Sequence, residues 1–206
     1  IEESFPLDWM YPHLTPYGII MKINRQQVPE FTQEIVDRDH EFWSQYSTRL
    51  VGDVIDYDTP IKEITDMINR VFLRRDYTDF KGDRKFIRDD NAKKAFSKLR
   101  SAIGGGDFWR INHAQAKGNM VEQARMIKEA DFAFKQAFAF CPFSPEAVFR
   151  YNNLLVSLKR YDDALLITQT FLKFDPKNIA VQQLQAQLHA LKAQPQAAAQ
   201  PAAAQA

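Results

Sequence analysis

The chain alternates between stretches in which apolar residues recur at helical spacing and short polar stretches. Apolar residues three and four positions apart occupy residues 35–50, 61–72 and 92–103. Thr59 with Pro60 is a suitable cap and first-turn pair for the second stretch, and Asp89 or Asp90 is a suitable cap for the third. Residues 76–90, between the second and third stretches, are polar and rich in turn formers. The pattern predicts three helices in the first half of the chain, separated by turns.

Three consecutive glycines, Gly104 to Gly106, interrupt the third helical stretch, and the helical spacing resumes over residues 108–116. Because each glycine inside a helix costs about 1 kcal/mol relative to alanine, we expect a kinked or interrupted helix here. A phosphate-binding glycine loop is the alternative. No strand-like run precedes the glycines and no Lys with Ser or Thr follows them at the required spacing, so the sequence does not favour that loop.

The first 29 residues contain four prolines and many aromatic residues. Proline lacks a backbone donor and restricts the residue before it, so a continuous helix is excluded. The aromatic side chains need a surface to cover. We therefore expect an extended docking segment over residues 1–29, with a short strand over residues 18–23, packed on a neighbouring body. If that body lies outside this chain, the segment is a docking strap.

A repeat of 34 residues is visible in the second half of the chain. Residues 145–178 fit two antiparallel helices joined by a turn near Lys159 and Arg160. A shift of 34 places Ala164 on Ala130 and Pro176 on Pro142, so small residues and helix-ending prolines recur together. Residues 111–144 match only in their second half, because Gly118 and Asn119 predict a turn. The helix that pairs with this half is expected over residues 91–117.

The unit resembles a tetratricopeptide repeat, a helix-turn-helix module that stacks into superhelices. The residues at the positions of the repeat pattern are Val148, Tyr151, Leu155, Ala164, Phe171 and Pro176. Two positions depart from the pattern, because Asn152 replaces the usual glycine and Phe171 the usual second alanine. The resemblance implies an all-α, tetratricopeptide-like stack of antiparallel helix hairpins, preceded by the extended aromatic and Pro-rich segment. Residues 179–191 read as a closing helix with Val181, Leu184, Leu188 and Leu191 facing inward.

These expectations divide the chain into four parts. They are the docking segment 1–29, a helical region 30–110, the repeats with their capping helix 111–192, and a disordered Ala/Gln/Pro tail 193–206.

The resemblance also indicates which side of the repeat would bind a partner. Its groove-facing positions correspond to Glu146, Phe149, Arg150, Asn153, Val156 and Ser157. Phe149 and Arg150 are the expected anchors, because aromatic and arginine side chains dominate contact energies. The partner would be a protein or a peptide segment. The alternative is that neighbouring helices or the tail cover this face.

The phrase ESFPLDWMYPHLTPYGIIMKINR, followed by an acidic helix and repeat helices, is similar to the soluble C-terminal region of bacterial membrane proteins related to protein O-mannosyltransferases. This resemblance implies a position on the non-cytoplasmic side of a membrane. It also implies contact between residues 5–21 and a membrane-embedded part of the same polypeptide, and an accessory role in positioning an acceptor. Such enzymes keep their catalytic acid in the membrane-embedded part, so no catalytic residue transfers to this chain.

Charge is distributed unevenly, although the net charge of the 206 residues is only +1. Residues 1–69 carry 5 Lys and Arg against 13 Asp and Glu, residues 70–100 carry 11 against 5, and residues 101–206 carry 11 against 8. Fields of opposite sign attract over about 8 to 10 Å at physiological salt, so we favour contact between the acidic and basic regions over two separate partners. No apolar run is long enough for a membrane span, and the acidic start is unlike a signal peptide.

Candidate chemistry is sparse. Residues 37–41 and 53–58 contain clustered acids, but a solvated helix face and turn capping explain these better than a metal site. Cys141 is alone and beside a proline, as expected of a small buried apolar residue. The basic stretch 70–100 raises nucleic-acid or anionic-surface binding as an alternative, which its five aspartates oppose. We predict no catalytic residue, no metal site and no cofactor.

Overall fold

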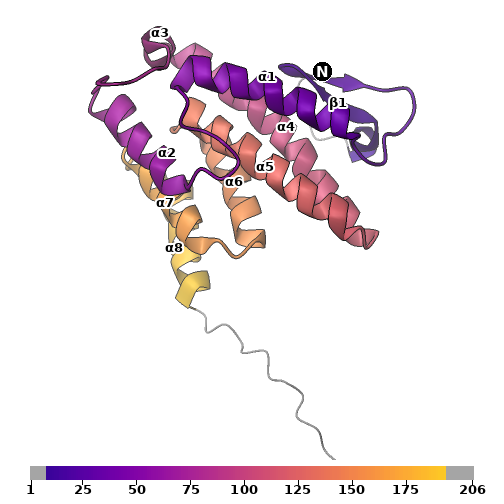
Figure 1. Cartoon of the computed structure of the whole chain (residues 1–206). Helices are drawn as coiled ribbons and strands as arrows, with labels where there is room; N and C mark the ends of the chain where they lie inside the picture. Colours follow the sequence, from indigo (N-terminus) through magenta and orange to yellow (C-terminus); the bar gives the residue numbers. More distant parts are fainter. Residues whose placement is uncertain (1–7, 194–206) are drawn as a thin grey trace, which may run out of the picture.

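The structure is a computed structural model that describes residues 8–193, and within this range it is all-α apart from one small β-hairpin (Figure 1). The eight α-helices are α1 (Gln33–Val51), α2 (Ile61–Ile68), α3 (Arg84–Arg88), α4 (Asp90–Ala116), α5 (Met120–Phe140), α6 (Pro145–Ser157), α7 (Tyr161–Leu172) and α8 (Ile179–Ala193). A π-helical turn, η2 (Asn69–Leu73), extends α2.

The N-terminal segment is more structured than its sequence suggests. A 3-10 helix, η1 (Asp8–His13), leads into an antiparallel hairpin of β1 (Leu14–Tyr17) and β2 (Ile20–Ile23). The predicted short strand over residues 18–23 is present as β2, but the prediction missed its partner strand β1 and the 3-10 helix before it. Gly18 makes the tight turn possible, since its φ of 61° lies in the left-handed region that favours glycine.

Polar side chains cap the first turn of most of the helices, including the predicted cap at Asp89. The Thr32 hydroxyl accepts a hydrogen bond from the Ile35 N–H, and the Asp89 carboxylate accepts one from the Ala92 N–H at 2.9 Å. Side chains of Asn119 and Ser144 cap α5 and α6 in the same way. Each cap satisfies a backbone donor that has no partner within its own helix.

The stretch predicted to be only turns, residues 76–90, contains the short helix α3. The Asp83 carboxylate caps it by accepting from the Lys85 N–H at 2.7 Å. Phe86 and Ile87 are buried, so burial of two apolar side chains holds this helix despite its polar surroundings.

Helix α4 runs through the three glycines as one helix, so the predicted interruption is absent. A Cβ added at Gly104 would lie 2.9 Å from Cε1 of Phe134 and 3.2 Å from Cβ of Ala133, both on α5. Glycine is therefore the residue that lets α4 and α5 approach closely. The contact with α5 holds the helix together where glycine alone would loosen it.

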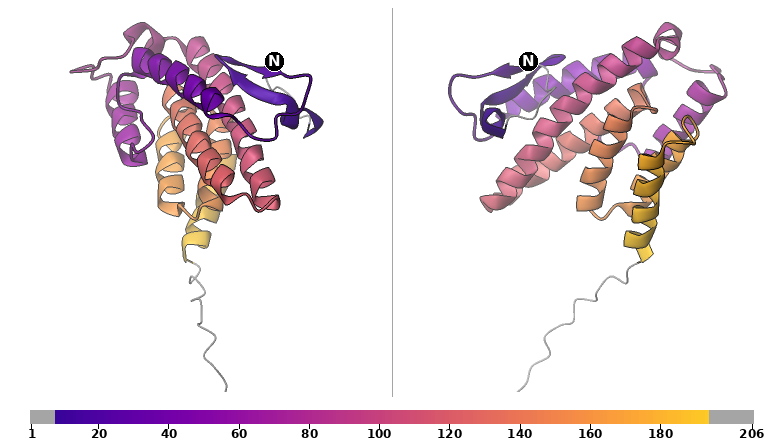
Figure 2. Two further views of the ribbon diagram at one scale, coloured as in Figure 1. Left: turned by 45° about the vertical axis from the view of Figure 1, so that its right-hand side comes forward. Right: turned by 180° about the vertical axis from the view of Figure 1, so that it is seen from behind.

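Helix α5 lies at the centre of the body. It contacts α1, α2, α4 and α6, and α7 in turn contacts α2, α6 and α8 (Figures 1 and 2). Every residue of α5 from Glu129 to Phe140 is buried. Ala130 and Ala164 have no exposed surface, in agreement with their predicted role at close helix contacts. Residues 145–178 form the predicted pair of adjacent helices, joined at residues 158–160.

Helix α8 closes the array as predicted. Val181 and Leu188 are buried and Leu184 is packed against the core. Ala193, assigned to the tail from the sequence, is the last residue of α8, and the rest of the predicted tail lies outside the described residues, as do residues 1–7 of the docking segment. Among residues 8–193, none of the helices is both long enough and apolar enough to cross a membrane.

Candidate interaction surfaces

Helix α6 presents its predicted site on the side opposite the core. The core side is fully buried and consists of Ala147, Val148, Tyr151, Leu154 and Leu155. Of the predicted binding residues, Glu146, Asn153 and Ser157 are exposed, and Phe149, Arg150 and Val156 are half-buried.

The two predicted anchors on α6 are partly engaged within the chain. Nε of Arg150 lies 3.2 Å from Oε1 of Glu146, one helical turn away. Phe149 packs partly against the hydrophobic core. A partner at this face would therefore contact mainly the outer edges of these two side chains.

A second surface, which we call the hairpin face, lies on η1 and the β-hairpin. It carries five exposed apolar side chains, Trp9, Tyr17, Ile19, Ile20 and Ile23, whose exposed fractions range from 40% to 69%. Tyr17 and Ile20 share one side of the hairpin, and Ile23 alternates onto the other side, at its outer end. Strand register places Tyr17 directly opposite Ile20, and Ile19 lies in the turn beside them. The sequence reasoning anticipated that this segment covers a neighbouring body, and Met10, Leu14 and Met21 do so. The sequence reasoning did not distinguish these three buried residues from the exposed residues of the hairpin face.

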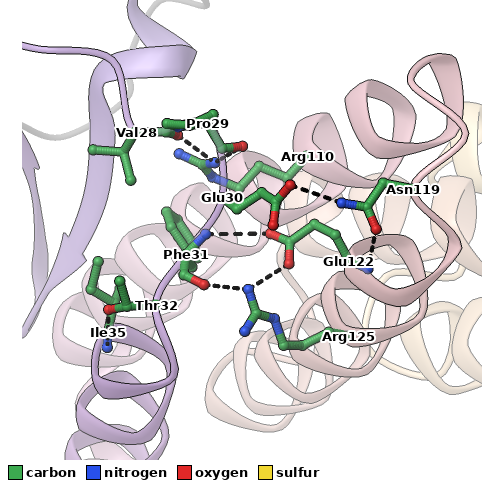
Figure 3. A network of polar contacts seen from close by, with 10 residues as sticks. All are labelled: Val28, Pro29, Glu30, Phe31, Thr32, Ile35, Arg110, Asn119, Glu122 and Arg125. Carbon is green, nitrogen blue, oxygen red and sulfur yellow. Dashed lines mark hydrogen bonds and ion pairs between the residues drawn. The ribbon is translucent and has the colours of Figure 1, made fainter.

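Arg110 of α4 anchors the hairpin to the helical body (Figure 3). Its guanidinium donates hydrogen bonds to the carbonyl oxygens of Leu14 at 3.0 Å, Val28 at 2.9 Å and Pro29 at 3.4 Å, and stacks 3.8 Å from the centre of the Phe31 ring. Burial lowers the pKa of Arg110 to about 10, so the side chain remains charged at neutral pH.

Helix α5 and its cap hold residues 30–31, in the link between the hairpin and α1, through a second set of contacts (Figure 3). Glu122 accepts a hydrogen bond from the Phe31 N–H at 3.4 Å, and Arg125 donates to both the Phe31 carbonyl and Glu122. Asn119 donates to Glu30 at 2.8 Å. Hydrogen bonds that involve charged groups are stronger than those between neutral groups, so the hairpin and residues 28–31 are held firmly against α4 and α5.

A cavity of about 10 Å³ lies between the hairpin and α4, lined by residues that include Met21, Gly106, Asp107 and Arg110. Such a volume holds about one water molecule. Burial raises the pKa of Asp107 well above its usual range, and the nearby Asp39 carboxylate raises it further, partly offset by Arg100. Asp107 is 4% exposed and makes no ion pair within the described residues, although Arg100 and Arg110 lie close enough to lower its pKa in part.

The acidic stretch 37–41 contains the solvated face that its sequence predicts, together with one buried acid. Asp37 and Glu41 are exposed, but Asp39 is buried and pairs with the Arg100 guanidinium at 2.8 Å. Arg100 also donates to the Gln136 side chain at 2.7 Å. This pair joins the acidic first third of the chain to its basic middle, and exposed Lys81 pairs with Asp53 at 2.7 Å.

Another ionisable cluster surrounds Tyr57, whose hydroxyl donates to both carboxylate oxygens of Glu129 at 2.7 and 2.9 Å. The His40 ring stacks on Tyr57 with ring centres 4.3 Å apart. Burial raises the pKa of Glu129 and lowers that of His40. Nothing among residues 8–193 groups three or more His, Cys, Asp or Glu side chains so that they could hold a metal ion.

Cys141 is buried, as its sequence context predicts, and burial raises the pKa of its thiol to about 11.

Comparison of the chain with protein-family models, with curated proteins and with solved structures found no match in any of the three.

Proposed function

We propose that this chain is a non-catalytic helical interaction domain that binds another protein. The hairpin face carries this proposal, because five large apolar side chains stay 40–69% exposed on an element that is firmly anchored. Apolar surface that a protein leaves open in this way is typical of interaction sites.

Charge around the hairpin face indicates the chemistry of the partner. Exposed Lys22 and Arg25 flank it, and the Arg38 guanidinium lies 5.7 Å from the centre of the Tyr17 ring. These cations favour a partner with an apolar patch and an acidic rim. Helix α1, which contacts β1, carries exposed carboxylates that include Glu34 and Asp37. A flat anionic lipid surface would meet these carboxylates as well as the cations, whereas the acidic rim of a protein can face the cations alone, so a protein is the better partner.

The helices α4 to α8 form the second part of the proposal, a tetratricopeptide-like stack with α6 as a further binding face. Its support is the consecutive packing of α4, α5, α6, α7 and α8, with buried Ala130 and Ala164 at the predicted positions. Glu146, Phe149, Arg150, Asn153, Val156 and Ser157 remain the proposed contact residues on this face.

Site-specific photo-crosslinking separates these two surfaces. A benzophenone amino acid is placed at Tyr17, at Phe149 or at Lys62, an exposed control position on α2, in the protein produced in its native cell. We expect a discrete adduct from position 17 and none from position 62. The adduct is then identified by mass spectrometry, and the purified partner should bind the Ile20→Asp variant at least tenfold more weakly. Adducts of equal yield at all three positions, or none at positions 17 and 149, would refute the proposal.

A second candidate function is an accessory domain that positions the acceptor of a membrane glycosyltransferase. The resemblance of residues 3–25 to proteins related to O-mannosyltransferases favours it, and the exposed hairpin face would then contact the membrane-embedded part. Hydrophobic spans encoded directly upstream of Ile1 in the parent reading frame are the expected result. A start codon or a signal peptide there would remove this candidate.

A further inference from the structure

An unusual group of arginines surrounds Tyr77, in the loop between η2 and α3. The guanidinium carbons of Arg84 and Arg88 lie 5.3 and 6.0 Å from the centre of the Tyr77 ring. Arg84 also reaches the Tyr77 carbonyl oxygen at 3.5 Å. Arg75 approaches the tyrosine from the other end of the loop and holds a left-handed backbone, with φ of 56°, which few residues other than glycine adopt.

The hydroxyl of Tyr77 lies among these cations. Its oxygen is buried, and the Arg75 and Arg88 side chains lie close enough to interact with it, although no hydrogen bond of good geometry joins it to the described residues 8–193. Burial raises the pKa of Tyr77, but the interactions with Arg75 and Arg88 outweigh it, so the pKa is lowered. The hydroxyl therefore faces cations and has no acceptor for its own proton among the described residues, which points to an anionic group that completes the site.

Carboxylates close to this cluster are committed elsewhere. Asp76 accepts from the Thr78 N–H at 2.9 Å, Asp83 caps α3, and Asp90 pairs with Lys93 at 2.7 Å. Within the described residues neither Arg84 nor Arg88 makes an ion pair, nor does Arg75. Three guanidinium groups and a hydroxyl therefore converge with no counter-charge within ion-pair distance.

We propose that Tyr77, Arg75, Arg84 and Arg88 form a binding site for a single phosphate group. Arginine forks donate paired hydrogen bonds that match phosphate oxygens, and the Tyr77 hydroxyl adds one more donor. The site would take a free phosphate or the terminal phosphate of a small ester or lipid headgroup. It is distinct from the hairpin face and the α6 face, and it adds a ligand to the protein–protein function proposed above.

A polyanion such as nucleic acid fits this surface less well. Exposed Asp76 and Asp79 belong to the same loop, and each carboxylate opposes the release of counterions that drives binding along a phosphate backbone. A compact site for one phosphate avoids this cost.

The test is an NMR titration of the whole chain with inorganic phosphate at constant ionic strength, with sodium chloride as the reference salt. We expect the side-chain N–H signals of Arg84 and Arg88 to shift saturably with phosphate and not with chloride. The Arg84→Gln and Arg88→Gln variants should each bind about tenfold more weakly, as expected for the loss of a charge-assisted hydrogen bond. Lys85→Gln removes an equal charge from the same helix without a contact to Tyr77, and should change the affinity less than twofold.

Tyr77→Phe provides a variant that keeps the ring under the arginines and removes only the hydroxyl. It should weaken phosphate binding about fivefold with no loss of thermal stability, which keeps the test valid if an arginine variant fails to fold. Phosphatidic acid vesicles form a second arm. Binding to them alone, with the same difference between the Arg84 and Lys85 variants, would support the site and identify a lipid source. Equal effects of Arg84→Gln and Lys85→Gln, equal shifts with chloride, or binding to RNA only would overturn the proposal.

Discussion

Replacement of single glycines in α4 tests how closely α4 and α5 approach. At Gly104 an added methyl group would lie 2.9 and 3.1 Å from two ring atoms of Phe134, whose ring is only 1% exposed and has no room to move. Gly104→Ala gains about 1 kcal/mol in helix propensity. Overpacking of a filled core costs about 1 to 3 kcal/mol, so we expect a net loss of about 1 kcal/mol.

Gly106→Ala is the matched control on the same helix. The only contact of its added methyl group would be with Sδ of Met21 at 3.7 Å, an ordinary van der Waals distance. The gain in helix propensity then remains, and this variant should be about 1 kcal/mol more stable than the wild type. The two substitutions are chemically identical and two residues apart, so their difference of about 2 kcal/mol reports the contact with α5.

Urea unfolding followed by circular dichroism at 222 nm measures both variants. We expect opposite shifts of the unfolding midpoint with an unchanged slope, because the surface exposed on unfolding stays the same. A double-mutant cycle with Phe134→Leu should recover most of the loss at Gly104. If Gly104→Ala stabilises the protein as much as Gly106→Ala does, α4 and α5 are not in close contact at Gly104 and the explanation for the continuous helix fails.

Three further predictions concern buried charges. The folded Asp107 carboxyl has a raised pKa, so the contribution of Asp107 to stability is most favourable below its unfolded pKa and is lost as the pH rises through the folded pKa; Asp107→Asn should remove that part of the pH dependence in urea unfolding curves from pH 4 to 8. Asp131→Ala leaves Tyr151, Arg160 and Lys135 without their shared acceptor and should cost about 3 to 5 kcal/mol, whereas Asp131→Asn should cost clearly less in the same assay. Arg110→Met leaves the carbonyl groups of Leu14, Val28 and Pro29 without their donor, and hydrogen exchange should accelerate over residues 14–31 but not in α7.

Helix positions were predictable because they depend on local signals. The cap at Asp89 and the turn at Gly118 and Asn119 act within a few residues, and the structure confirms them. Helix α2 begins directly after Pro60 as predicted, but no side chain caps it, so Thr59 does not have the predicted role. The pairing of the helix over residues 91–117 with the one that follows is also confirmed by the contact of α4 with α5. Whether the array is a tetratricopeptide-like stack stays a prediction.

Failures of the sequence reasoning have a common physical cause, which is contact between residues far apart in the chain. The glycines of α4 were read from helix propensity alone, although Phe134 of α5 decides their effect. The hairpin was missed because prolines hide strand pairing, while Arg110 of α4 fixes its position through the Leu14 carbonyl. Neither partner is visible within a local window of the sequence.

The candidate sites were less predictable than the fold for a related reason. An exposed apolar residue and a buried one look alike in sequence, so Ile20 and Met21 could not be assigned to opposite faces before the hairpin register was known. The arginines around Tyr77 were counted only as a basic stretch. Their convergence depends on α3, which places Arg84 and Arg88 one helical turn apart on the same side.

Over residues 8–193, the acidic first third of the chain and its basic middle meet in two ion pairs and not in one large electrostatic contact. The Asp39–Arg100 pair lies in the interior, and Lys81–Asp53 is on the surface. These are the ion pairs within the described residues that link the acidic first third to the basic middle. The carboxylates of Glu34 and Asp37 and the cations around Tyr77 therefore remain open to other molecules. The exposed arginines around Tyr77 therefore keep the positive field that the proposed phosphate site requires.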